Sequence, residues 1–187
     1  MNQPNLKPFL SVEDYIEGEL HSEVKHEYLG GEVYAMAGAS RAHNLIVGNV
    51  FAALHRHLRG GPCRVFMSDM KVRIQNMRDD YFYYPDVMVA CRPEDKARYW
   101  CEQPKLLVEV LSESTERVDT REKLFAYQTI ADLEEYVVLA QDRREATVFR
   151  RSGREWFSVK VTGDELLELV SVGLSVGLAE IYEGVEG

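Results

Sequence analysis

Two acidic residues, Asp86 and Glu109, stand inside apolar runs of the sequence. Asp86 lies in Tyr-Phe-Tyr-Tyr-Pro-Asp-Val-Met-Val-Ala, and Glu109 lies in Lys-Leu-Leu-Val-Glu-Val-Leu-Ser. Both runs have the length and the β-branched and aromatic content of buried strands. An ionised carboxylate in a buried strand costs several kcal/mol unless it is paired, protonated or bound to a metal. The two acids therefore predict a shared cation inside a sheet.

A lysine follows the second acid on the next expected element. Residues 119–130 are expected to form a helix with Lys123, Tyr127 and Ile130 on one face. This helix can return Lys123 toward the end of the strand that carries Glu109. Lys105, on the same face of that strand as Glu109, is the alternative lysine.

A cation held by two carboxylates beside a lysine has the parts needed for phosphodiester hydrolysis. Carboxylate oxygens without a nearby Cys or His suit Mg²⁺ or Mn²⁺ and not zinc. Such an ion lowers the pKa of a bound water and neutralises charge on a phosphoryl oxygen. The lysine would orient or deprotonate that water, or stabilise the transition state. The alternatives are that Asp86 caps a turn, that Glu109 and Lys123 form a structural ion pair, or that Lys123 is a surface residue.

The length, composition and charge restrict the class of protein. The chain has 187 residues, of which 45% are hydrophobic and 28% charged. We expect a flexible arm over residues 1–10 and a single domain over 11–187. Neither a membrane-spanning run nor a signal peptide is recognisable, so we expect a cytoplasmic protein. The net charge of −9 opposes general attraction to nucleic acid, and the arginines of residues 143–154 are read as solvated surface.

The cysteines are expected to be reduced. There are three of them, Cys63, Cys91 and Cys101, and none has CxxC spacing. An odd number without that spacing argues against a disulfide framework and against a zinc site.

The remaining patterns give the expected order of elements. A helix capped by Ser11 is predicted over 11–20, and a hairpin over 25–37 makes a primed turn at Gly30-Gly31. A second helix, capped by Ser40, is predicted over 40–58, because residues 46, 47, 50 and 54 give it one apolar face. His43 in its first turn is expected to be structural. One strand is expected over 63–74, paired in a hairpin with the strand of Asp86. Strands over 135–140, 144–151 and 155–161 and a helical turn over 178–182 complete the chain. This order predicts an α/β fold with a mixed β-sheet flanked by helices and antiparallel hairpins.

Several motifs resemble a known nuclease family. Pro85-Asp86 followed by Glu109 on the next strand resembles the PD-(D/E)XK nuclease superfamily. More narrowly, most of the chain, from about residue 13 to 151, resembles the Uma-type family of restriction endonucleases. That resemblance is carried by four stretches: Glu-Tyr-Leu-Gly-Gly-Glu-Val-Tyr-Ala-Met-Ala-Gly-Ala-Ser-x-x-His, Tyr-Pro-Asp-Val-Met-Val, Leu-Val-Glu-Val-Leu-Ser-x-Ser-Thr and Asp-x-x-x-Lys-x-x-x-Tyr.

The resemblance implies a restriction-endonuclease-like core, a Mg²⁺ or Mn²⁺ cofactor and a DNA substrate. It makes Asp86 and Glu109 the metal ligands, with Glu27 as an additional early acid. Glu32, in the same hairpin, is the alternative to Glu27. The superfamily lysine belongs two positions after the strand acid, where this chain has Leu111. The resemblance therefore makes Lys123 a relocated catalytic lysine.

Three functions fit these observations. The first is a metal-dependent DNA endonuclease, the second a catalytically inactive nuclease fold that serves as a binding module, and the third a hydrolase of small phosphate esters. An endonuclease needs Asp86, Glu109 and Lys123 in one open cleft, whereas an inactive module would scatter them or hold them salt-bridged in a dry core. A homodimer is an expectation that rests on analogy with nucleases that cut duplexes.

Overall fold

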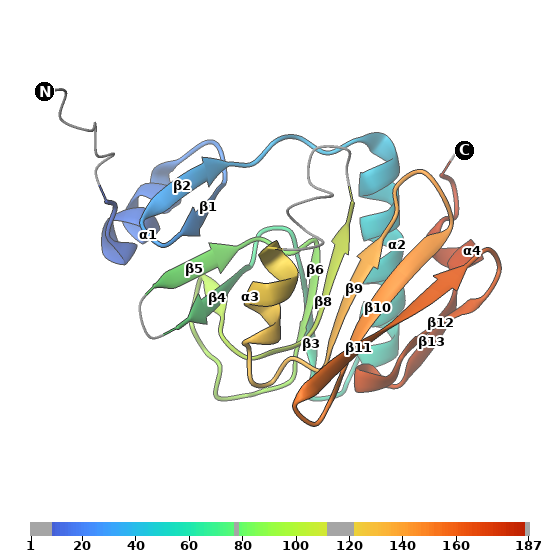
Figure 1. The fold of residues 1–187 in the computed structure, drawn as a ribbon. Helices are drawn as coiled ribbons and strands as arrows, with labels where there is room; N and C mark the ends of the chain where they lie inside the picture. The colour runs from blue at the N-terminus through green and yellow to red at the C-terminus, as the bar shows by residue number, and fades with distance from the viewer. Residues whose placement is uncertain (1–8, 77–78, 112–121, 186–187) are drawn as a thin grey trace, which may run out of the picture.

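The strand that carries Glu109 lies near the middle of a six-stranded sheet. A computed structural model describes residues 9–76, 79–111 and 122–185 (Figure 1). The strand order of this sheet is β11-β10-β9-β8-β6-β3. Strands β8 and β9 pair in parallel and the other neighbours are antiparallel, so the sheet is mixed as predicted. Its strands are β3 (Arg64–Met67), β6 (Val87–Ala90), β8 (Pro104–Val110), β9 (Glu135–Leu139), β10 (Glu145–Ser152) and β11 (Glu155–Thr162).

A second sheet of five strands has the order β2-β1-β5-β4-β7. Its strands are β1 (His26–Leu29), β2 (Glu32–Ala35), β4 (Lys71–Gln75), β5 (Asp80–Tyr83) and β7 (Trp100–Cys101). The hairpin of β1 and β2 turns at Gly30 and Gly31, whose φ angles of 54° and 96° fit the primed turn predicted there. A third sheet consists of β12 (Leu166–Leu169) and β13 (Leu174–Gly177).

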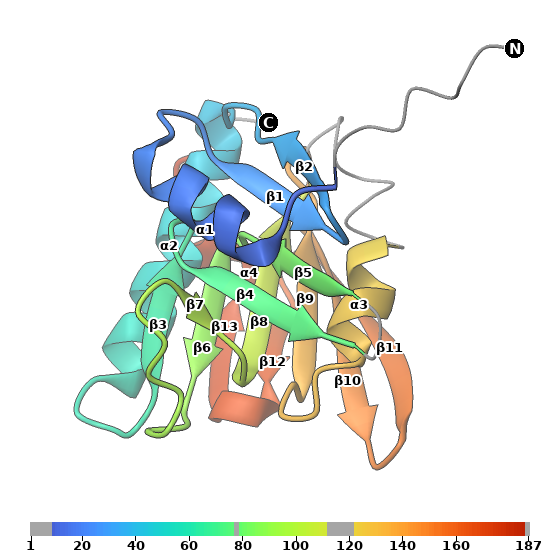
Figure 2. The ribbon, with the colours of Figure 1, turned by 90° about the vertical axis from the view of Figure 1, so that its left-hand side faces the viewer.

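The helices cover different faces of these sheets. They are α1 (Val12–His21), α2 (Arg41–Leu58), α3 (Leu124–Gln128) and α4 (Leu178–Ile181). The apolar face of α2 packs with the β12–β13 hairpin and α4 against one face of the six-stranded sheet. On the opposite face, α3 and the five-stranded sheet enclose a second core that includes Tyr83, Leu107 and Tyr127 (Figures 1 and 2). The predicted site residues belong to this second face.

Two predictions of continuous strands were wrong, because the chain crosses between sheets inside each run. The 63–74 run divides into β3 in the six-stranded sheet and β4 in the five-stranded sheet. Ser68, with φ of 33°, makes the turn between them. The run of Asp86 divides likewise into β5 and β6, with Pro85 between, so β4 pairs with β5 and β3 pairs with β6. Asp86 therefore lies in the crossover that directly precedes β6, not inside a strand.

The other elements follow the sequence pattern more closely. Ser11 and Ser40 cap α1 and α2 through their side chains, as predicted. The predicted 119–130 helix ends earlier than expected, since α3 ends at Gln128; a π-type turn at Glu122 and Lys123 precedes α3. The predicted start of this helix falls among residues 112–121, which lie outside the described part of the chain. Residues 1–8 of the predicted arm also lie outside it, and Leu10 is tied to Gly31 by a backbone hydrogen bond. In the described ranges, no helix has both the length and the apolar character to span a membrane.

The prediction of three reduced cysteines was wrong for two of them. Cys63 and Cys91 form a disulfide, with their Cα atoms 4.0 Å apart. They flank the antiparallel pair of β3 and β6, in which Arg64 stands opposite Ala90. Strand pairing, which spacing in the sequence does not reveal, brings the two thiols together. Cys101 is free and buried, as expected.

The disulfide gives a testable stability difference. It closes a loop of 28 residues, and the chain-entropy model then gives about 3.5 kcal/mol of stabilisation. We expect the Cys63→Ser/Cys91→Ser double variant to lose most of that free energy of unfolding in urea titrations. Detection of three free thiols per chain in unreduced, denatured protein would contradict the bond.

Candidate active site

Glu109 and Lys123 meet in the core between the sheets. The Lys123 Nζ atom lies 3.2 Å from Glu109 Oε1, and the Tyr127 hydroxyl donates to the same oxygen at 2.9 Å. Lys123 and Tyr127 are four residues apart on consecutive turns, so both reach the strand end of Glu109, as the helical spacing predicts. The side chains of Glu109 and Lys123 are only 4% and 7% exposed. The ion pair is thus almost fully removed from solvent. This is the salt-bridged dry core expected of an inactive module, and not the open cleft expected of an endonuclease.

Glu27 from the first hairpin joins this pair. Its Oε1 atom lies 3.0 Å from Lys123 Nζ and accepts a hydrogen bond of 3.4 Å from the backbone N–H of Tyr84. The lysine therefore bridges two carboxylates that come from different sheets, since Glu27 lies on β1 and Glu109 on β8. The ring of Tyr83 adds a cation–π contact, with Lys123 Nζ 5.7 Å from its centroid.

Asp86 lies at the same end of the sheet. Val87 and Val108 are ladder partners on β6 and β8, so Asp86 and Glu109 both come next to that pair. Asp86 Oδ2 accepts a hydrogen bond of 2.8 Å from the backbone N–H of Val110, the residue after Glu109. The strand that carries Glu109 thereby holds the carboxylate of Asp86 in place.

His43 is a site residue that sequence reasoning missed. Its Nε2 atom lies 3.1 Å from Asp86 Oδ2, and each of these side chains is 15% exposed. His43 occupies the first turn of α2, where its backbone N–H is capped by Ser40. The sequence alone favours a structural role for this histidine. The signal that pointed to it was its place at the end of the Gly-Ala-Ser-x-x-His stretch.

The alternative residues fall elsewhere. Lys105 pairs with Glu134 at 3.1 Å near the surface. It lies four residues before Glu109, and this distance along a strand is about 13 Å, so it does not reach the acids. Glu32 accepts a hydrogen bond of 2.6 Å from Tyr34 on β2. Leu111, at the position of the usual superfamily lysine, packs against the core around Tyr127. Of the candidate lysines, the structure brings Lys123 to the acids.

Burial controls the protonation of the tyrosines around the site. Burial and the neighbouring Glu109 raise the pKa of Tyr127 well above its ordinary value. The pKa of Tyr83 is raised by burial and then by Glu27. The Tyr127 hydroxyl therefore stays protonated throughout the neutral range and remains a donor to Glu109.

The donor set fits a hard divalent cation. Asp86 and Glu109 supply carboxylate oxygens, which Mg²⁺ and Mn²⁺ prefer, and no cysteine lies among these contacts. The expectation that no histidine lies nearby was wrong, because His43 contacts Asp86. In the ranges that the structure describes, no three His, Cys, Asp or Glu side chains form a ready cage for a metal ion. Mg²⁺ is commonly held by one or two protein carboxylates, with water and substrate phosphate completing its shell. The pair is consistent with that kind of site.

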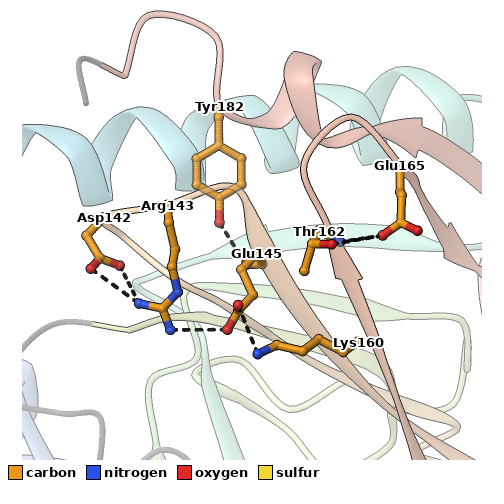
Figure 3. Close-up of polar contacts among 7 residues, drawn as sticks. All are labelled: Asp142, Arg143, Glu145, Lys160, Thr162, Glu165 and Tyr182. Carbon is orange, nitrogen blue, oxygen red and sulfur yellow. Dashed lines mark hydrogen bonds and ion pairs between the residues drawn. The ribbon is translucent and has the colours of Figure 1, made fainter.

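Arg143 and Arg144, late in the chain, are engaged in local ion pairs. Figure 3 shows Arg143 between Asp142 and Glu145, and Lys160 on the other side of Glu145. Hydrogen bonds from Arg143 and Lys160 lower the pKa of Glu145. Arg144 pairs with Asp164 in the same region. These two arginines agree with the interpretation of the group as solvated surface. For Arg150 and Arg151 that interpretation was wrong: Arg150 pairs with the buried Glu135 at 2.7 Å, and Arg151 donates to the backbone carbonyls of Gln128 and Ile130.

The Tyr127 hydroxyl provides a first test of the site. We expect Tyr127→Phe to lower the free energy of unfolding by about 2 kcal/mol, because a buried carboxylate loses a hydrogen bond. Tyr83→Phe is the matched control: its ring centroid lies 5.6 Å from that of Tyr127, and no described residue hydrogen-bonds its hydroxyl. Equal losses in the two variants would contradict a special role for the Tyr127 hydroxyl.

Comparison with known proteins identifies the family. The Uma2 family model, described as "Putative restriction endonuclease", matches residues 12–179. Two uncharacterised Synechocystis proteins are similar in sequence. The protein slr1290 is 35% identical over 95% of this chain and 94% of its own length. The protein sll1609 is 31% identical over 83% of this chain and 89% of its own length.

A solved structure has a similar fold. It is described as a putative nuclease belonging to DUF820 from Anabaena variabilis, and it matches with a TM-score of 0.68 at 14% identity. The match covers 86% of this chain and 91% of that one. At this identity the likeness supports the fold, which is of the predicted restriction-endonuclease-like type. The match of the family model over residues 12–179 shows that the chain belongs to the Uma2 family, whose model is described as "Putative restriction endonuclease".

Proposed function

We propose that this protein is a metal-dependent endonuclease that hydrolyses DNA phosphodiester bonds with a Mg²⁺-activated water. The observation that carries this proposal is that Lys123 contacts both Glu27 and Glu109. The Asp86 carboxylate lies beside them, held by a hydrogen bond from the Val110 N–H on β8. These residues come from four separate segments of the chain. Membership of the nuclease-like family supports the same conclusion.

Asp86 and Glu109 are the proposed metal ligands, with Glu27 as a third acid and Mg²⁺ or Mn²⁺ as the ion. When bound, the ion would activate water and neutralise charge on the scissile phosphate. The Val110 N–H and His43 hold the Asp86 carboxylate, while Tyr127 holds that of Glu109. Preorganised ligands need no rearrangement when the reaction proceeds.

Lys123 is proposed as the catalytic lysine, because this chain has Leu111 at the position where the superfamily has its lysine. Between two carboxylates its side chain is most stable as an ammonium group. An ammonium group donates hydrogen bonds but cannot take a proton from water. We therefore assign it to orienting the attacking water and to stabilising negative charge on the phosphoryl oxygens, and not to the role of general base.

A catalytically inactive binding module is the second candidate. The observation that favours it is the burial of Lys123 in contact with two acids, which is the arrangement of a structural ion network. The net charge of −9 also opposes broad attraction to DNA.

A substrate panel tests the proposal. Purified protein is incubated with supercoiled plasmid, circular single-stranded DNA and bis(p-nitrophenyl) phosphate, each with Mg²⁺ or Mn²⁺. The proposal predicts nicked and linear plasmid in the presence of metal. Turnover of the small ester alone would indicate a small phosphate-ester hydrolase. Failure to cleave any substrate with either metal would contradict catalysis and favour the binding module.

A further inference from the structure

Strand β11 leaves one long edge of the six-stranded sheet open. It is the last strand in the order, and β10 is its single ladder partner in the described part of the chain (Figure 2). Phe157 and Val159 on this strand are 45% and 40% exposed. Long edge strands with exposed apolar side chains tend to pair with another strand, and proteins usually protect them with charges, bulges or a covering segment.

The hairpin with β10 determines which backbone groups point outward. Ser152 and Glu155 close a two-residue turn, so Glu155 and every second residue after it hydrogen-bond to β10. The N–H and C=O groups of Trp156, Ser158 and Lys160 therefore point away from the sheet. The next outward N–H, that of Thr162, donates to Glu165 Oε2 at 2.7 Å (Figure 3). The available edge therefore runs from Trp156 to Lys160.

We propose that this edge pairs antiparallel with β11 of a second copy of the chain, about a two-fold axis at Ser158. In this register Ser158 faces Ser158 of the second copy, Trp156 faces Lys160, and Phe157 faces Val159. The outward groups then make about six hydrogen bonds across the axis. On one face the register joins two apolar pairs, and on the other it places an ammonium beside an indole ring.

Charge selects this register over its neighbours. At each end of the pairing, Arg154 faces Thr162 of the second copy. Thr162 is hydrogen-bonded to the Glu165 carboxylate, so this register places the positive charge of Arg154 near a negative one. No other described residue hydrogen-bonds or pairs with the Arg154 side chain. Moving the axis to Phe157 would place Arg154 opposite Lys160, and like charges directly opposite are destabilising. Moving it to Val159 would require the Thr162 N–H, which Glu165 already occupies.

A cysteine pair tests the register. Opposed residues of a hydrogen-bonded pair have Cα atoms about 5.5 Å apart, within the range of a disulfide. We expect Ser158→Cys to give a covalent dimer on a non-reducing gel after mild oxidation. Glu155→Cys is the matched control: it is exposed on the same strand, but the register separates its two copies by about 20 Å. Equal cross-linking of the two variants would overturn the register.

Sedimentation tests the interface itself. We expect the wild type to sediment as a dimer at tens of micromolar and Ser158→Pro as a monomer, because proline removes an outward N–H without breaking the ladder to β10. Arg154→Glu, which leaves the backbone unchanged, should raise the dimer dissociation constant about tenfold. A monomeric wild type, or unchanged association of Arg154→Glu, would overturn the proposal.

Discussion

Asp86→Asn is expected to lower the rate of plasmid cleavage about a thousandfold while the protein stays folded. The amide keeps the size of the side chain and an oxygen that can accept from Val110 N–H. It loses the negative charge that would hold a divalent cation, and a thousandfold loss corresponds to about 4 kcal/mol of transition-state stabilisation. Cleavage rates are measured under single-turnover conditions, with circular dichroism to confirm the fold.

Asp69→Asn is the control for this change. Asp69 lies on the turn between β3 and β4, exposed and paired with Lys25. It belongs to the same part of the molecule but contacts none of the proposed catalytic residues. We expect its cleavage rate to equal that of the wild type. A comparable loss in both variants would mean that acidic charge in general, and not the Asp86 carboxylate, is what cleavage requires.

Lys123→Met should abolish cleavage and also destabilise the protein. The substitution retains an unbranched side chain but leaves the buried carboxylates of Glu27 and Glu109 without their shared ammonium. Removal of one partner from a buried ion pair costs about 3–5 kcal/mol. Urea titration measures the stability loss, and cleavage is measured well below the unfolding midpoint so that the two effects are separated.

Lys105→Met separates the relocated lysine from its alternative. Lys105 lies on β8 like Glu109, but its pair with Glu134 is near the surface, where ion pairs contribute little. We expect its stability to change by less than about 1 kcal/mol and its cleavage rate to remain unchanged. Loss of cleavage in Lys105→Met with retention in Lys123→Met would reverse the assignment of the lysine.

The sequence predicted the elements whose signals are local. The Ser40 cap and the apolar spacing of residues 46, 47, 50 and 54 predicted α2, and Gly30-Gly31 predicted the first hairpin. The spacing of Lys123 and Tyr127 placed both on the face that meets Glu109. The two acids could be recognised because charges in apolar runs are costly without a partner.

Non-local pairing explains what the sequence did not predict. The turn at Ser68 and the crossover at Pro85 divide runs that read as continuous strands, because each half is completed by a different sheet. The Cys63–Cys91 bond depends on the pairing of β3 with β6. His43 reaches Asp86 only because α2 starts at the strand ends of the six-stranded sheet. Of these contacts, the one made by His43 alone had a sequence signal, its place at the end of the Gly-Ala-Ser-x-x-His stretch.

The most direct test of the proposed function is cleavage of supercoiled plasmid by wild type and Glu109→Gln in parallel, each with Mg²⁺ or with EDTA. The proposed function predicts that wild type with Mg²⁺ cleaves, and that chelation or loss of the Glu109 charge abolishes cleavage. Cleavage that survives in EDTA, or that Glu109→Gln retains with Mg²⁺, would contradict a metal-dependent site built on Asp86, Glu109 and Lys123.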